Sequence, residues 1–299
     1  MDKFSVFVPK LLPQKEHFLS GRRSCKGCGK AMAARIASKA VARDAVLAGP
    51  SGPGPLSAAA SHGFAHDRVT CDDMIENTFD YIDALNGQSA HRAIKKPVVA
   101  VDREVLQSDY LALTRVLQND KPALYLCFDN EQYVDKFLES AAPQPFIVNE
   151  APRAVTPEHV AELIREKQLP PLVNEGDFSY AATAGPGYPF DLIEKVKKGI
   201  SCPGNAFILI LTPCPTGWIF PSGQTAVMGR LAVQTGYFPL YEIDEGKLTI
   251  TQRLEKRAPV GQYLMKQRRF MILPPPLLPA LQQAVDSVYE DLLQKEKQD

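Results

Sequence analysis

Two cysteines lie three positions apart in the stretch "SGRRSCKGCGK" (20–30), surrounded by cations and glycines. Thiols at this spacing can bind a metal ion, ligate an iron–sulfur cluster or close a disulfide, and they can also be purely structural. The neighbouring Lys and Arg side chains favour the ionised thiolate, which is the form that binds metal. We expect Cys25 and Cys28 to hold a cluster or a metal, with zinc as an alternative because tetrahedral thiolate sites suit both.

A helix is predicted directly after the second thiol. In "GKAMAARIASKAVARDAV" (29–46), Ala, Met and Ile recur at helical spacing. Gly29 allows the backbone to turn sharply into the helix. The N-terminal end of a helix carries partial positive charge, which favours thiolates and anionic clusters.

Polar residues follow two short apolar stretches, "KKPVVAVDRE" and "PALYLCFDNE". Each reads as a buried strand, and the alternation of such strands with helical patterns predicts an α/β protein with a largely parallel sheet. Ligands of such sheets bind beyond the carboxyl ends of the strands. Asp102 and the pair Asp129–Asn130 fall at those ends.

Further elements follow from the same periodicities. The most hydrophobic strand, in "NAFILILTPCPTGW", leads straight into Cys214, and a turn at 244–246 predicts a hairpin. The predicted helices are 71–87, 108–119, 157–169, one from about Pro189, 224–236 and 280–298. The organisation predicted is an N-terminal arm (1–24), an α/β domain (25–255) and a C-terminal extension with a helix (256–299).

Composition excludes several classes of function. The 299 residues include 34 Lys plus Arg and 34 Asp plus Glu, so the formal net charge is zero and neither nucleic acid nor an anionic membrane is expected as a partner. No apolar run approaches the ~20 residues that a membrane span needs. The N-terminus lacks the pattern of a secretory signal. We therefore expect a cytoplasmic protein without membrane insertion, whose six cysteines are too sparse for a disulfide scaffold.

Several segments together resemble a known family. "CKGCGKAMAARIASKA", "CFDNEQY", "YPFDLIEKVKKGI", "FILILTPCPTGW" and "GRLAVQTGYFPLYEI" are similar in order and spacing to the β subunit of 2-oxoacid:ferredoxin oxidoreductases, the pyruvate synthase type. The resemblance covers roughly residues 18 to 275. It implies a three-layer α/β fold of the thiamine-diphosphate-binding type, with a mostly parallel sheet.

The resemblance also implies cofactors and partners. The family's β subunit binds thiamine diphosphate with Mg²⁺ at the strand ends and a [4Fe–4S] cluster nearby, and the thiamine cofactor carries the carbon chemistry. Partner chains are an α-type subunit and a ferredoxin-like subunit, with ferredoxin or a similar acceptor taking the electrons. By this resemblance Cys25, Cys28 and Cys214 are three cluster ligands. Asp102, Asn130 and the carbonyl of Gln132 match the positions of the Mg²⁺ ligands.

The sequence departs from the family pattern at three motifs. No cysteine stands at the position of the fourth cluster ligand, where the chain reads "LAGPSGPG", and Cys71 is the candidate to replace it. The family's "GDG" turn corresponds to Val101–Asp102–Arg103, without the glycines that let the backbone approach a diphosphate. The family's "NTG" is replaced by "DKF" at 135–137.

These departures predict a β-like subunit of an oxidoreductase complex that acts on 2-oxoacids. It would carry an iron–sulfur cluster but have a degenerate thiamine site, and so play a structural or electron-relay role. Two alternatives remain open at this stage. One is an active thiamine-dependent β subunit with atypical ligation, and the other is a scaffold subunit with no cofactor.

Overall fold

The computed structural model describes about half of the chain. The described residues are 12–13, 15, 24–41, 45–47, 54–55, 80, 83–84, 96, 98–103, 122–131, 134, 160, 164–165, 169, 178–272 and 277–298. The helices predicted at 71–87, 108–119 and 157–169 fall largely or wholly outside these ranges, as do Cys71, Gln132 and the segment 135–137.

One eight-stranded sheet forms the centre of the molecule, in the order β2-β1-β3-β4-β6-β5-β7-β8. The five strands β1, β3, β4, β6 and β5 pair in parallel, whereas β2, β7 and β8 pair with their neighbours in antiparallel fashion. Their bounds are β1 Ala45–Leu47, β2 Gly54–Pro55, β3 Val98–Asp102, β4 Leu124–Asp129, β5 Tyr180–Ala184, β6 Ala206–Leu211, β7 Tyr241–Asp244 and β8 Lys247–Ile250.

The central strands are buried on both faces, as parallel strands usually are. All six residues of β4 and of β6 are buried, which explains their near-continuous runs of apolar residues. β3 pairs with β4, and β4 with β6, along their full lengths. The carboxyl ends of these strands therefore lie at one edge of the sheet, and the residues that follow them are neighbours.

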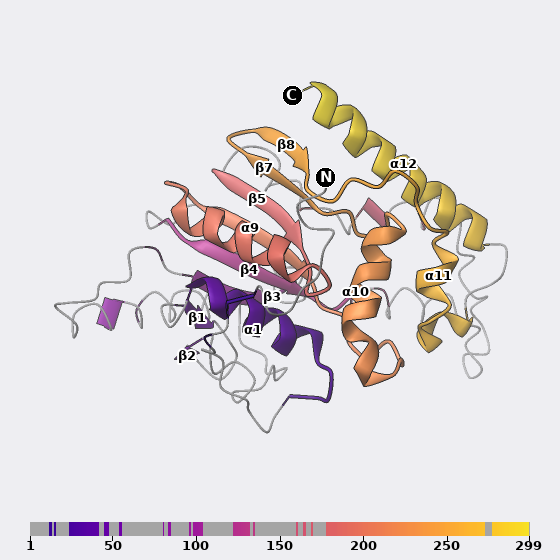
Figure 1. The fold of residues 1–299 in the computed structure, drawn as a ribbon, viewed down its shortest axis with the longest axis horizontal. Coiled ribbons are helices and arrows are strands. Elements are labelled where there is room, and N and C mark those ends of the chain that lie inside the picture. The colour runs from indigo at the N-terminus through magenta and orange to yellow at the C-terminus, as the bar shows by residue number, and fades with distance from the viewer. Residues whose placement is uncertain are drawn as a thin grey trace, which may run out of the picture.

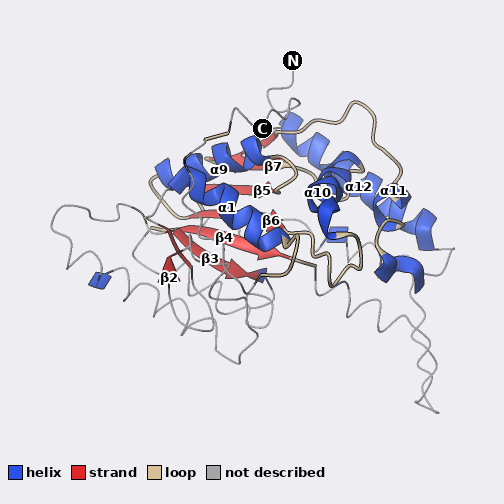
Figure 2. Ribbon diagram, turned by 60° about the horizontal axis from the view of Figure 1, so that its bottom comes forward, coloured by secondary structure: helices blue, strands red, loops and turns tan. Residues whose placement is uncertain are grey.

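Helices α1 (Gly29–Val41) and α9 (Pro189–Ser201) cover one face of the sheet. They pack against each other and share a hydrophobic cluster with alternate strand residues such as Ala100, Leu126 and Ile208. Figure 2 shows the two helices side by side above the strands. Pro189 at the first turn suits a helix start, because its missing N–H would have no partner there.

The other set of strand side chains belongs to a second cluster. It contains Val99, Tyr125 and Leu209 together with buried residues of three more helices. Those helices are α10 (Thr225–Gln234), α11 (Gly261–Leu264) and α12 (Leu277–Gln298), with the short 3-10 helices η3 (Ser222–Gln224) and η4 (Arg268–Ile272). Figure 1 shows α10 and α11 beyond the carboxyl ends of the strands, and α12 alongside β8.

The predicted class is confirmed: helices and a mostly parallel sheet form an α/β protein, with one hydrophobic cluster on each face of the sheet. The hairpin is confirmed too, since β7 and β8 flank a two-residue turn in which Glu245 and Gly246 both have positive φ. The C-terminal helix begins at Leu277, three residues earlier than predicted, and its apolar side packs into the second cluster. Across the described ranges, none of the helices is both long and apolar enough to span a bilayer.

Candidate functional site

The first half of the site is the turn that carries Cys25 and Cys28. The N–H of Cys28 donates to the carbonyl of Cys25 (3.1 Å), and the carbonyl of Cys28 accepts from Met32 (3.0 Å). The second thiol thus sits immediately before α1. Cys25 is exposed and Cys28 is partly buried.

Two glycines let this turn touch a distant part of the backbone. Gly27 has φ +73°, and a Cβ placed on it would lie 2.1 Å from the carbonyl oxygen of Ser222. A Cβ on Gly29 would lie 2.4 Å from the carbonyl oxygen of Pro213. The hydroxyl of Thr225 donates to the carbonyl of Gly27 (2.6 Å). The turn is therefore held between the exit of β6 and the start of α10, beside Cys214.

Cys28 and Cys214 are close enough to interact electrostatically. Burial raises the pKa of the Cys28 thiol, and the Cys214 thiol adds to this, whereas the backbone N–H groups of Ala31 and Lys30 act in the opposite direction. The N–H of Gly217 points at the sulfur of Cys214 (3.3 Å) and would stabilise negative charge there.

The early and late cysteine segments thus meet, although they are far apart in the sequence. In the described part of the chain, however, no group of three His, Cys, Asp or Glu side chains is arranged to hold a metal ion. The assignment of Cys25, Cys28 and Cys214 as cluster ligands stays a prediction, as does the role of Cys71.

The second half of the site lies at the end of β3, where Asp102 pairs with Lys30 of α1. The lysine ammonium lies 2.7 Å from Oδ2 of Asp102, and only 9% of the lysine side chain is exposed. The second oxygen, Oδ1, is buried and has no hydrogen-bond partner among the described residues. The predicted Mg²⁺ ligand is therefore already neutralised by a cation that the sequence analysis did not consider.

At the end of β4 a second ion pair is buried. The Arg103 guanidinium lies 2.8 Å from Oδ2 of Asp129, and the side chains are only 9% and 2% exposed. Oδ1 of Asp129 accepts from the N–H of Glu131 (2.7 Å). Both carboxylate oxygens of Asp129 are thus occupied.

A third buried pair adjoins the position of Asn130. Glu131 has φ 57° and is fully buried, and its carboxylate pairs with the Arg269 guanidinium. Arg269 also lies 4.4 Å from the ring centre of Trp218, whose indole N–H donates to the carbonyl of Asn130 (2.8 Å). Arg269 therefore ties the C-terminal segment to the end of β4.

The described residues do not fit a Mg²⁺–diphosphate site as they lie. Mg²⁺ requires near-octahedral oxygen ligands and shares them with the phosphates. Here Lys30 and Arg103 already neutralise the acids at the ends of β3 and β4. By the family resemblance, Arg103 also stands at the position of a glycine that would let the backbone approach the diphosphate.

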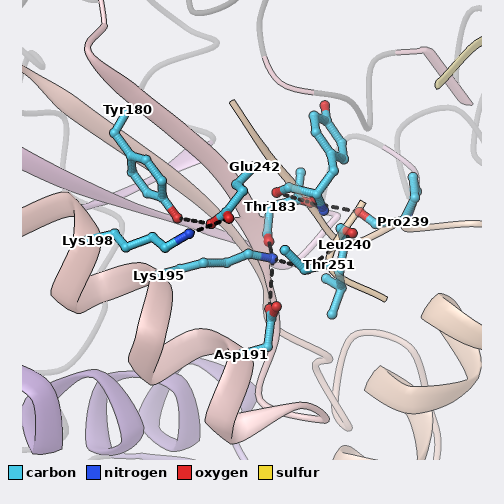
Figure 3. Close-up of polar contacts among 10 residues, drawn as sticks. Tyr180, Thr183, Asp191, Lys195, Lys198, Pro239, Leu240, Glu242 and Thr251 are labelled. Carbon is cyan, nitrogen blue, oxygen red and sulfur yellow. Dashed lines mark hydrogen bonds and ion pairs between the residues drawn. The ribbon is translucent and has the colours of Figure 1, made fainter. Parts of the chain in front are cut away.

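A separate polar network lies under α9, beside β5 and β7 (Figure 3). The ammonium of Lys195 donates to Asp191, to the carbonyl of Thr183 and to the hydroxyl of Thr251, each at 2.8 Å. Burial lowers the pKa of Lys195, and Asp191 opposes that shift. Because all three N–H donors of the ammonium are used, the network reads as structural support for the sheet rather than as a reaction site.

Sequence reasoning missed Lys30, Glu131 and Arg269. Lys30 and Arg269 pair with acids 72 and 138 residues away, and no local pattern signals such contacts. The sequence contained a partial signal for Arg103. It follows Asp102 directly, and a long cationic side chain at that position must either pair with an acid or lie exposed.

The chain is similar in sequence to several known proteins. No protein-family model matches the chain. The pyruvate synthase subunit PorB of Methanocaldococcus jannaschii is 31% identical over 289 residues, which cover 92% of this chain and 95% of that subunit. The ketoisovalerate oxidoreductase subunit VorB of Pyrococcus abyssi is 31% identical over 291 residues, which cover 94% of each chain.

Among solved structures, a 2-oxoglutarate:ferredoxin oxidoreductase from Magnetococcus marinus is 16% identical, with a TM-score of 0.33 over 72% of this chain and 70% of that one. A TM-score of this size does not define a shared fold.

Proposed function

Because this chain belongs to the family of PorB- and VorB-type β subunits of 2-oxoacid:ferredoxin oxidoreductases, we propose that it serves such a complex as a β-type subunit without a thiamine diphosphate of its own. It is a structural or electron-relay subunit, and the carbon chemistry takes place on another chain. The complex includes an α-type and a ferredoxin-like subunit, passes electrons to ferredoxin or a similar acceptor, and resides in the cytoplasm.

One observation carries the proposal: the acids at the ends of β3 and β4 are paired with Lys30 and Arg103. Breaking a buried ion pair by removing one partner costs about 3–5 kcal/mol, because the other charge is left uncompensated. A Mg²⁺–diphosphate group would have to displace both cations before the acids could bind it. The loss of the glycine at Arg103 acts in the same direction.

The electron-relay role rests on the thiol turn. Its backbone contacts at Gly27 and Gly29 hold Cys28 beside Cys214, and Cys25 lies in the same turn. A bound [4Fe–4S] cluster would supply one-electron transfer. This chain's own contribution is the N–H of Gly217 on the sulfur of Cys214 and the N-terminal end of α1, both of which favour negative charge on the ligands.

The test is to purify the complex without oxygen and to quantify iron, sulfide and thiamine per copy of this chain. We expect about four irons, as in a [4Fe–4S] cluster, absorbance near 400 nm, and the loss of both in Cys214→Ser. We also expect no thermal stabilisation of the isolated chain by millimolar thiamine diphosphate with Mg²⁺. A clear upward shift in melting temperature that Asp102→Ala abolishes would reject the proposal, because only a ligand that binds the folded state stabilises it.

A second candidate is an active β subunit with atypical ligation. It is favoured by Oδ1 of Asp102, which is buried and without a hydrogen-bond partner among the described residues, and which could still meet a cation. Stoichiometric thiamine diphosphate on this chain would select this alternative. A colourless chain without iron that still copurifies with its partners would instead indicate a scaffold.

A further inference from the structure

An exposed apolar surface adjoins the turn that carries Cys214. Most large apolar side chains of the described residues are buried, but Ile219, Met265 and Met271 are 49%, 56% and 72% exposed. We call these three residues, with Lys266 and Arg268, the methionine patch. Exposed apolar side chains that gather on one surface of a protein can mark a binding site.

Two local features bring Ile219, Arg268 and Met271 of the patch together, and Met265 and Lys266 shortly precede Arg268 in the chain. The N–H of Arg268 donates to the carbonyl of Ile219 (3.3 Å), which joins the Cys214 turn to the segment 265–271. Arg268 and Met271 are three residues apart in the 3-10 helix η4, where such residues share a face. Between them, Arg269 and Phe270 point inward and are buried.

Hydrogen bonds and an ion pair anchor the patch to the turn that carries Cys214. The N–H of Trp218 donates to the carbonyl of Cys214 (2.9 Å), and Ile219 follows directly. Buried Arg269 lies over the Trp218 ring and pairs with Glu131 at the end of β4. A partner that binds this surface would therefore contact a segment that is joined both to the Cys214 turn and to the end of β4.

The backbone of Ile219 adopts an unusual conformation. Its φ of 56° lies in the left-handed region, which is unfavourable for a β-branched residue. Conformations of this kind concentrate at functional sites, where the surrounding structure holds them in place. Here the result is an isoleucine whose side chain is half exposed to solvent.

The positive charge of the segments around the patch indicates what kind of partner would bind there. The chain as a whole is neutral, but residues 212–241 and 256–285 together contain six Lys or Arg and no Asp or Glu. Two of these cations, Arg257 and Arg269, are paired with acids from other segments. Lys266 and Arg268 are exposed, and neither forms an ion pair within the described ranges.

We propose that the methionine patch is the docking surface for an acidic, ferredoxin-like electron carrier, which it brings close to Cys214. The cations steer an acidic protein, and the flexible, polarisable methionines adapt to its apolar centre. The proposal rests on the proposed electron-relay function, since an electron carrier needs a cluster nearby.

The test compares two double variants of the complex, isolated with its partner chains and without oxygen. Lys266→Glu with Arg268→Glu reverses the charge of the patch. Lys247→Glu with Lys297→Glu makes the same change in net charge at two exposed positions, one at the start of β8 and one near the C-terminal end of α12. Figure 1 shows that this end of α12 lies away from α11. The probe is a purified clostridial-type ferredoxin, and the readout is its Kd at low and high salt.

We expect the first double variant to weaken binding about tenfold at low salt, and less at high salt, because the effect is electrostatic. The control double variant should leave the Kd within about twofold. A second patch variant, Met265→Ser with Met271→Ser, should weaken binding at both salt concentrations, since it removes exposed apolar area without changing charge. Equal Kd values for the two charge-reversed complexes would overturn the proposal.

Two further readouts separate the possible failures. Size-exclusion chromatography shows whether a patch variant loses a partner subunit, which would make the patch a subunit interface and overturn the proposal. Iron is quantified in each preparation. If the wild type holds no iron but the Kd contrast persists, the docking surface stands and the relay function fails. If iron is present but the contrast is absent, the docking surface fails alone.

Discussion

The carboxyl ends of β3 and β4 and the carboxyl end of β6 lie along the same edge of one sheet, but they are built differently. At β3 and β4, buried acids are paired with cations from this chain, Lys30 and Arg103. At β6, glycines allow two backbone segments to touch, and sulfur atoms remain beside them. The acids of the first region are paired within the chain, whereas no ion pair engages the sulfur atoms of the second region among the described residues.

This difference bears on the proposed absence of a thiamine site. The long side chain of Arg103 reaches an acid, Asp129, and pairs with it in the interior. The thiol turn depends on backbone contacts that tolerate no added atom. The two regions should therefore respond differently to substitution.

The largest effect is expected from breaking the buried ion pair at the end of β4 with Arg103→Met. Asp129 would be left charged and unpaired in the interior, which should lower the free energy of unfolding by about 3–5 kcal/mol. Urea denaturation of the isolated chain measures this loss.

Two controls sharpen that result. Combining Arg103→Met with Asp129→Asn should recover part of the stability, because no charge is then left unpaired. Lys197→Met removes an exposed pair, with side chains 53% and 45% exposed, and should change the free energy of unfolding by less than about 0.5 kcal/mol. If Arg103→Met were as mild as Lys197→Met, the β3–β4 region would not depend on its buried ion pairs.

A somewhat smaller effect is expected in the thiol region from Gly27→Ala. The new Cβ would overlap the carbonyl oxygen of Ser222, and the positive φ is unfavourable for alanine. Together these should cost about 3 kcal/mol of stability. Gly223→Ala is the matched control, since nothing lies within 4 Å of its Cβ position. The melting temperatures of both variants are compared by thermal unfolding. Equal values would mean that the turn does not pack closely against the backbone of Ser222.

The smallest effect concerns reactivity rather than stability. In the iron-free chain, iodoacetamide should label exposed Cys25 before Cys28, as followed by mass spectrometry. Burial raises the pKa of Cys28, so less of its reactive thiolate is present at pH 8 than for an ordinary cysteine. Its labelling rate should continue to rise with pH beyond the ordinary thiol pKa. A rate that levels off at lower pH would contradict the raised pKa.

The same reasoning applies to cluster loading. Because thiols must lose their protons to bind metal, the raised pKa of Cys28 makes loading compete with protons. Iron incorporation into the iron-free chain should therefore increase between pH 7 and pH 9. Cys28→Ser, which has no thiol to deprotonate, should remove this dependence along with most of the iron.

Much of the fold followed from the sequence because strands and helices have local signatures. The apolar runs around Val99 and Ile208 predicted β3 and β6, and the turn at 244–246 predicted the hairpin. The parallel arrangement followed from the alternation of elements. Among the site residues, the type and spacing of Cys25 and Cys28 and the polar strand ends at Asp102 and Asp129 were visible without a structure.

The sequence by itself thus determined which residues could do chemistry and which elements would carry them. Only the tertiary structure decided their partners. Lys30 meets Asp102 across 72 positions, Arg269 meets Glu131 across 138, and Thr225 meets Gly27 across 198. The physical reason is that periodicity reports how a side chain faces its own element, whereas an ion pair or a close backbone contact depends on how separate elements pack.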